Sequence, residues 1–198
     1  NATAMAVMAL KAVGRNGAAR QGRDWLIGKQ LPGGGWEYST GWGPDANSTG
    51  LAVQALVAMG VKPAAVSNKG TPFDFLKTLQ LDCTTSPDDR GALDYQEQTP
   101  QVANDFATAQ VGQALARTAL PVDWRRARSG LPRLDCPGAK GALLTTRPGQ
   151  AAAGYLGRVL KDHRGVIPNA FGPGPDFGTT ANAVLSLVAA RRGARQVD

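Results

Sequence analysis

The chain has 198 residues, of which 42% are hydrophobic and 19% charged, and its formal net charge is +7. This length suits one domain with a hydrophobic core, and the composition excludes an intrinsically disordered protein. Apolar residues never run for the roughly 20 positions that a membrane-spanning helix needs, so we expect no membrane span. We interpret the positive charge as a solvated face rather than a nucleic-acid site, because the arginine clusters lack interleaved aromatic residues for base stacking. These clusters are Arg125, Arg126 and Arg128, and then Arg191, Arg192 and Arg195.

A sequence pattern that recurs four times predicts the helices of an inner layer. Its copies cover residues 1–14, 47–60, 106–117 and 178–190, and the first two are identical at eight of fourteen positions. Asn47 or Ser48 can cap the start of the second copy, and Gly14 and Gly60 can close the first two in the left-handed conformation. Between these caps the copies are apolar on almost every side, which is typical of a buried helix.

A second kind of helix follows each of the first three copies and predicts an outer layer. These helices cover residues 17–30, 71–80 and 149–162, and each has one apolar and one polar face. The order predicts seven α-helices that alternate between the layers, in a single domain over residues 1–198. Two long stretches rich in Pro, Gly, Ser and Asp, near 82–101 and 118–147, are expected to be loop insertions.

The segment from Gly22 to Trp36 resembles the QW motif of the squalene–hopene cyclase and protein prenyltransferase superfamily, which carries the prenyltransferase and squalene oxidase repeat. That motif has an aromatic and an aliphatic residue, followed by Gln-x-x-x-Gly-x-Trp. The first copy matches it with Trp25, Leu26, Gln30, Gly34 and Trp36; the second keeps Phe75, Leu76, Gln80 and Gly91 and ends at Leu93; the third keeps Tyr155, Leu156 and Gly165 and ends at Ile167. The resemblance implies an all-α fold of helical hairpins that forms a partial or complete α/α toroid. Gln30 and Trp36 are structural in such a motif, so we do not expect them to be catalytic.

The motifs that carry catalysis in the related enzymes are missing. The cyclases use an Asp-x-Asp-Asp acid, whereas the nearest acids here, Asp82, Asp88 and Asp89, have a different spacing. The prenyltransferases bind zinc through Asp, Cys and His, but Asp82-Cys83, Asp135-Cys136 and His163 do not reproduce the Asp-x-Cys spacing. We therefore expect no metal, no cofactor and a non-catalytic module that binds a small hydrophobic ligand or a protein partner. The alternatives are an enzyme that acts on an isoprenoid substrate and a purely structural scaffold.

Two cysteines, Cys83 and Cys136, bear on the compartment. They suit one disulfide in an exported protein or two buried thiols in a cytosolic one. We predict a disulfide that pins the 118–147 insertion to the neighbouring loop, and an extracellular or cell-surface location, with the cytoplasm as the alternative. No charged and apolar leader opens the sequence, so a signal peptide is expected to have been removed or never to have been present.

A ligand is expected at the rim where the inner helices begin, because their positive ends meet aromatic and acidic residues there. The candidate residues are Trp36, Tyr38, Trp42, Asp45, Tyr95, Asp105, Phe171 and Asp176. For Asp45 and Asp176 the alternative is that they only cap or brace the turn.

Both ends of the array are expected to leave an apolar flank of an inner helix uncovered. Such a flank usually marks an interface. It predicts either that the chain is part of a longer protein or that two copies meet as a homodimer.

Overall fold

A computed structural model describes residues 1–122, 130–132, 134, 136, 144 and 146–191. Within these residues the fold is all-α, as predicted, with isolated β-bridges but no strand. The helices are α1 (Ala2–Ala12), α2 (Asn16–Gly28), α3 (Ala46–Ala58), α4 (Pro72–Thr78), α5 (Asp105–Leu115), α6 (Pro148–Asp162) and α7 (Phe177–Ala189), with a short 3-10 turn, η1 (Pro63–Ala65), before α4. Arg125, Arg126, Arg128, Arg192, Arg195 and Asp135 lie outside the described residues, as does much of the 118–147 insertion.

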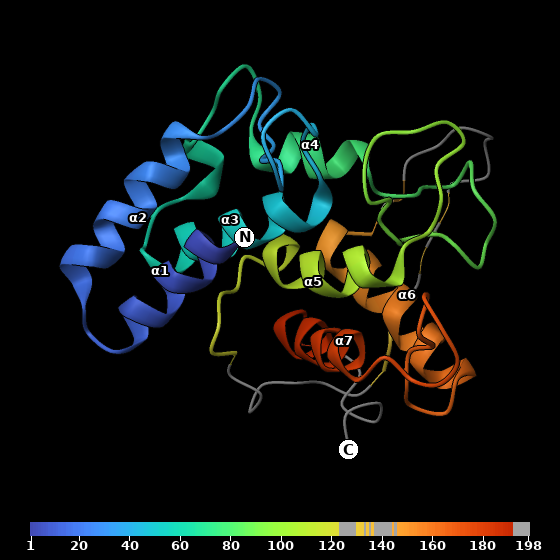
Figure 1. The fold of residues 1–198 in the computed structure, drawn as a ribbon. Helices are drawn as coiled ribbons and strands as arrows, with labels where there is room; N and C mark the ends of the chain where they lie inside the picture. Colours follow the sequence, from blue (N-terminus) through green and yellow to red (C-terminus); the bar gives the residue numbers. More distant parts are fainter. Residues whose placement is uncertain (123–129, 133, 135, 137–143, 145, 192–198) are drawn as a thin grey trace.

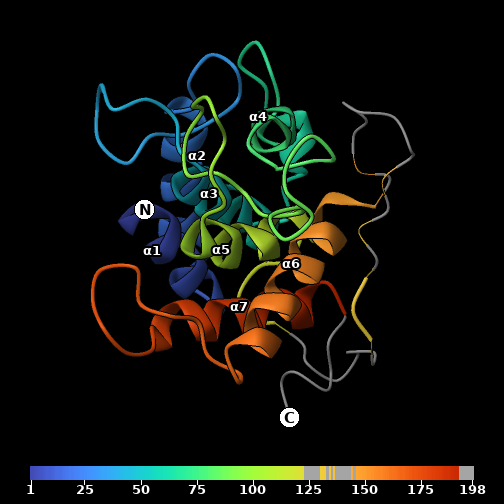
Figure 2. The ribbon, with the colours of Figure 1, turned by 90° about the vertical axis from the view of Figure 1, so that its right-hand side faces the viewer.

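The helices form the two predicted layers. The odd-numbered helices pack against one another in chain order. Of the outer helices, α2 packs on α1 and α3, α4 packs on α3, and α6 packs on α5 and α7. In Figure 1, α2, α4 and α6 lie at the left, top and right of the inner helices. Figure 2 shows α3, α5 and α7 following one another from top to bottom. No helix in the described ranges is long and apolar enough to cross a membrane.

Small residues let the inner helices approach closely. Every residue of α3 from Ala46 to Leu56 is buried. A Cβ atom on Gly50 would lie 3.0 Å from Cγ2 of Val111 in α5, and one on Gly112 would lie 2.7 Å from Oγ of Ser186 in α7. Alanine and glycine at these contacts thus produce the dense inner layer.

The C-terminal ends of the inner helices follow the prediction, whereas the predicted cap at the start of α3 is wrong. Gly14 and Gly60 have positive φ angles of +77° and +72°. At the start of α3, however, Asp45 is the N-cap, and its carboxylate accepts a 2.7 Å hydrogen bond from the backbone N–H of Ser48. Asn47 lies inside the helix, where its side-chain amide donates to Gln110 of α5. Asn47, which the local sequence favours as the cap, is therefore used in the contact between α3 and α5 instead.

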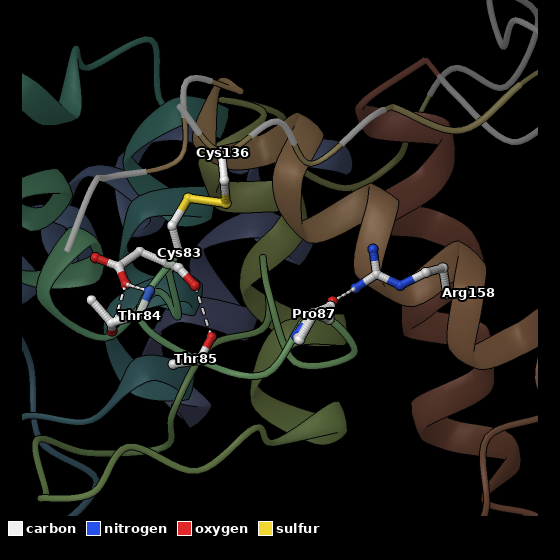
Figure 3. Close-up of a disulfide and its surroundings, with 7 residues drawn as sticks. Cys83, Thr84, Thr85, Pro87, Cys136 and Arg158 are labelled. Carbon is white, nitrogen blue, oxygen red and sulfur yellow. Dashed lines mark hydrogen bonds between the residues drawn. A yellow bond between two sulfur atoms is a disulfide. The ribbon is translucent and has the colours of Figure 1, made fainter. Parts of the chain in front are cut away.

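A disulfide links the loop after α4 to the segment before α6. The sulfur atoms of Cys83 and Cys136 are 2.04 Å apart, and the two residues are separated by 53 positions in the sequence. Figure 3 shows this bond and, near it, the side chain of Arg158 reaching from α6 to the carbonyl oxygen of Pro87. One covalent bond therefore links the loop to the segment before α6, and a hydrogen bond from Arg158 links it to α6 itself.

One flank of α1 is uncovered. Met5 and Val13 are 47% and 72% exposed, and Ala9 between them is exposed too. In the aligned copy, Leu51 and Ala55 occupy the positions of Met5 and Ala9 and are buried in a cluster with residues of α1. The corresponding expectation for α7 is met less fully, since Val184 and Leu185 are half-buried.

Candidate functional site

Three turns with the same hydrogen bonds place the start of α3, α5 and α7. The last residue of each QW-like motif donates its backbone N–H to a threonine hydroxyl in the next inner helix, and its carbonyl accepts from the N–H of that helix's N-cap. The pairs are Trp36 with Thr49 (2.9 Å), Leu93 with Thr108 (2.8 Å) and Ile167 with Thr180 (2.9 Å). The three caps, Asp45, Asn104 and Asp176, donate at 3.0, 3.0 and 2.8 Å.

The glutamine of the motif bridges its own turn to the next hairpin. Gln30 donates to the carbonyl of Gly34 at 2.9 Å and to that of Val66 at 3.4 Å. Gln80 donates in the same way to the carbonyls of Gly91 and Pro148, at 3.2 and 3.0 Å. These contacts are the structural role that the sequence predicted for Gln30.

Trp36 has a structural role as well. It is only 4% exposed, and its indole N–H donates to the carbonyl of Leu26 at 2.7 Å. It packs with Ala52 and Leu56 of α3 in one hydrophobic cluster. The side chain of Trp36 is therefore buried against α3, in keeping with the structural role predicted for it.

We call the segments between each turn and the next inner helix the rim loops: rim loop 1 is 37–44, rim loop 2 is 94–103 and rim loop 3 is 168–175. Rim loops 1 and 3 close on themselves through the bridges Glu37–Pro44 and Pro168–Pro175. Rim loop 2 is ordered by Asp94, whose carboxylate accepts from the backbone N–H of Tyr95 at 2.7 Å and of Val102 at 2.9 Å. The three loops lie at the starts of α3, α5 and α7.

The seam between rim loops 1 and 2 is closed by hydrogen bonds. The side-chain amide of Gln96 donates to the carbonyls of Trp42, Gly43 and Pro44, at 3.1, 3.4 and 3.5 Å. The carbonyl of Tyr95 accepts from the backbone N–H of Ala46 at 2.9 Å. These bonds tie rim loop 2 to rim loop 1 and to the start of α3.

The seam between rim loops 2 and 3 is open. The bridging residue Gln96 comes three positions after Leu93, the last residue of its motif. The equivalent residue in rim loop 3, three positions after Ile167, is Ala170, which has no side-chain amide to bridge the loops. A cavity of about 780 Å³ lies at this seam, and we call it the seam cavity. It is lined by Asp89, Tyr95, Ala103, Asn104, Asp105, Phe106, Tyr155, Ile167, Pro168, Ala170, Phe171, Asp176 and Thr179.

A hydrogen bond between an outer and an inner helix lies in the wall of the seam cavity. The hydroxyl of Tyr155 in α6 donates to Oδ1 of Asp105 in α5 at 2.5 Å. Burial, and then this hydrogen bond and the charge of Asp105, raise the pKa of the Tyr155 phenol far above its ordinary value of 10.0. The phenol therefore stays protonated and the carboxylate stays its acceptor.

The guanidinium of Arg158 lies over the Tyr155 ring, 6.0 Å from its centroid. It donates to the carbonyls of Asp88 and Arg90, at 3.1 and 3.0 Å. Burial lowers the pKa of Arg158, whereas the charges of Asp88 and other nearby acids act to raise it. These contacts hold the cation beside the acids of this loop.

The structure divides the eight predicted site residues among three surroundings. Tyr95, Asp105, Phe171 and Asp176 line the seam cavity. Tyr38 and Trp42 lie on rim loop 1, where both are exposed and their ring centroids are 6.0 Å apart at an angle of 42°. Trp36 and Asp45 are buried, and Tyr38 and Trp36 also line a smaller hollow of about 360 Å³ beside α1.

Two of the predicted acids are helix caps, which was the alternative for both. Asp45 caps α3, and Asp176 caps α7 by accepting from the backbone N–H of Thr179 at 2.8 Å. The hydrogen bonds from the backbone N–H and the hydroxyl of Thr179 lower the pKa of Asp176. Asp176 also lines the seam cavity, so its two roles coincide, whereas Asp45 is enclosed by protein.

Tyr155, Asp89 and Phe106 line the cavity but were not among the predicted site residues. Tyr155 carried one signal: it places a hydroxyl at the motif position where Trp25 and Phe75 have none. A buried hydroxyl needs a partner, and that partner proves to be Asp105. Asp89 and Phe106 carried no such signal. Among the described residues, no group of three His, Cys, Asp or Glu side chains could hold a metal ion.

Comparisons with known proteins add little to this geometry. No protein-family model matches the chain, and no curated protein matches it. Among solved structures, it is similar to a protein from Actinoplanes at 18% identity and a TM-score of 0.46, over 98% of this chain and 67% of that chain. Similarity at this level assigns neither fold nor function.

Proposed function

We propose that this chain is a non-catalytic module that binds a small ligand in the seam cavity. The observation that carries the proposal is the difference between the two seams: Gln96 closes one, and Ala170 leaves the other open. A concave site of this size, with aromatic walls and a few convergent polar groups, has the character of small-molecule sites in proteins.

The polar groups of the seam cavity favour binding over proton transfer. Because its pKa is raised, Tyr155 holds its proton, and Asp105 is already its acceptor. A general acid or base works best with a pKa near the operating pH, which this phenol lacks. The pair therefore supplies a fixed hydrogen bond in the cavity wall.

We also propose that the helical hairpins belong to the α/α-toroid arrangement that the QW motif suggests. The repeated contacts of Gln30 with Val66 and of Gln80 with Pro148 support this proposal, because both join one hairpin to the next. An exported location is proposed on the Cys83–Cys136 disulfide, since such bonds persist in oxidising compartments.

The proposal is tested with a variant that is designed to close the seam between rim loops 2 and 3. Ala170→Gln places an amide at the position equivalent to Gln96, and Ala65→Gln, on the exposed η1 turn, is the matched control. The natural protein and both variants are screened by thermal shift and by ligand-observed NMR against a small-molecule panel that includes squalene, polyprenyl diphosphates and corrinoids. We expect a ligand whose affinity falls about tenfold in Ala170→Gln, or about 1.4 kcal/mol, and is unchanged in Ala65→Gln.

Two outcomes would contradict the proposal. Equal binding by all three proteins would place the ligand away from the seam cavity. Conversion of an isoprenoid by the natural protein would support the enzyme alternative.

A further inference from the structure

We infer that the seam cavity selects an organic cation: an ammonium group carried on an aromatic or apolar body. This inference rests on the proposed ligand-binding function and names the chemical class of its ligand. It is drawn from the hydrogen-bonding capacity, the charges and the rings of the cavity wall.

The polar groups of the wall are mainly hydrogen-bond acceptors. Three carboxylates line the cavity, and no Lys, Arg or His is among its described lining residues. Two of the three hydroxyls in the wall already donate to these carboxylates: that of Tyr155 donates to Asp105, and that of Thr179 donates to Asp176 at 2.7 Å. The hydroxyl of Tyr95 and the side-chain amide of Asn104 are the other side-chain donors, and the three carboxylates outweigh them in charge and in acceptor capacity. A ligand that brings its own N–H donors therefore complements this wall better than one that brings acceptors.

The three carboxylates are not equivalent. Asp89 lies close enough to the guanidinium of Arg158 to interact with it electrostatically, so its charge is partly balanced. Asp176 is occupied in capping α7 with both of its oxygens. Asp105 accepts one hydrogen bond through Oδ1, and a carboxylate has room for several. Asp105 is therefore the anchor for the cation.

Aromatic rings line the same cavity as this anchor. Tyr95, Phe106 and Phe171 come from rim loop 2, α5 and rim loop 3 and line the same cavity. Ring faces attract cations, and the rings also bury the apolar body of a ligand. Phe171 is 98% exposed, which leaves its ring available to a ligand at the mouth of the cavity.

The test uses three probes of one shape and different charge: tryptamine, a cation; tryptophol, which is neutral; and indole-3-acetate, an anion. Their affinities are measured at pH 7 by calorimetry and by NMR titration of the labelled protein. We expect tryptamine to bind about tenfold more tightly than tryptophol, and indole-3-acetate to bind most weakly.

Three variants assign the effect to residues. Asp105→Asn keeps an oxygen for Tyr155 but removes the charge, so it should abolish most of the preference for tryptamine. Asp88→Asn removes an exposed acid of the neighbouring loop and should preserve that preference. Phe171→Ala, at an exposed position where folding should not suffer, should weaken tryptamine and tryptophol alike.

The outcomes separate the two proposals. Equal affinity for tryptamine and tryptophol would overturn the cation inference and leave the ligand-binding function in place. An undiminished preference in a folded Asp105→Asn protein would overturn the assignment of the anchor. If none of the three probes shifts resonances of the seam cavity, the cation inference fails, and the panel screened against Ala170→Gln decides the ligand-binding function independently.

Discussion

At the scale of single residues, the motif tryptophan joins two layers of the protein. Trp36 packs on α3 with its ring and bonds the last turn of α2 with its indole N–H. Trp36→Ala should lower the free energy of unfolding by about 3–5 kcal/mol, as for other large core aromatics. Urea unfolding measures this, with Trp42→Ala as control because Trp42 is 68% exposed. A loss of stability as large in the control would contradict the assignment.

The cap of α7 makes a prediction about pH. The folded pKa of Asp176 lies below its ordinary value of 3.8, so the unfolded chain binds the proton more tightly. Its contribution to stability is therefore complete above that value and is lost as the pH falls through the folded pKa. Asp176→Ala should cost about 1 kcal/mol at pH 7, as for other N-caps, and less at pH 2, which lies below the ordinary pKa of the carboxyl. Unfolding curves at the two pH values test this, and an equal cost at both would be inconsistent with it.

At the scale of elements, the space around the glycine of each motif shows how closely the next outer helix packs on that turn. Gly34 and Gly91 both have positive φ, and a Cβ on them would lie 2.3 Å from the carbonyl oxygen of Thr71 and 2.4 Å from that of Ala151. The next outer helix therefore begins or passes directly against these glycines. Gly165 has the same backbone conformation but faces open space in the described structure.

This difference gives a matched pair of variants. Gly165→Ala should cost only the backbone strain, about 1–2 kcal/mol. Gly34→Ala carries the same strain and an added clash with backbone, so its cost should exceed that of Gly165→Ala by at least about 1 kcal/mol. Thermal unfolding of the two variants measures the difference, and equal costs would show that α4 does not pack tightly on Gly34.

At the scale of the whole molecule, the disulfide constrains a long loop. Closing a loop over the 53 positions between Cys83 and Cys136 should stabilise the fold by about 4 kcal/mol through the entropy of the unfolded chain. Cys83→Ser with Cys136→Ser should therefore unfold at clearly lower urea concentration. A reducing agent should shift the natural protein to the same midpoint and leave the double variant unchanged. An unshifted midpoint would contradict the prediction.

The uncovered flank of α1 predicts association. Met5 and Ala9 occupy the positions at which α3 buries Leu51 and Ala55 against a neighbouring inner helix. We expect two copies to associate through this flank, so that Met5→Lys shifts the sedimentation profile toward the monomer. Lys11→Glu changes a charge on the same helix and serves as control. A natural protein that remains monomeric at high concentration would contradict this.

The sequence by itself determined the helices, because their signals are local. Every α-helix in the described ranges begins and ends within two residues of its predicted range, and Gly14 and Gly60 follow α1 and α3 in the predicted left-handed conformation. The structural role of Gln30 was also predictable, since it acts on its own turn four residues away. The use of Asp45 rather than Asn47 as the cap was not, because Asn47 is engaged by another helix.

Only the tertiary structure decided where the seam cavity lies. The contacts that define it join residues far apart in sequence: Gln96 and Trp42 are separated by 54 positions, and Asp105 and Tyr155 by 50. No local pattern encodes such pairings, because they depend on how the rim loops and α6 pack around the inner layer. The predicted rim residues were therefore divided: Tyr95, Asp105, Phe171 and Asp176 lie at one cavity, whereas Trp36 and Asp45 are buried elsewhere. The physical reason is that a helix depends on its neighbours in sequence, whereas a cavity depends on which side chains fail to fill a seam.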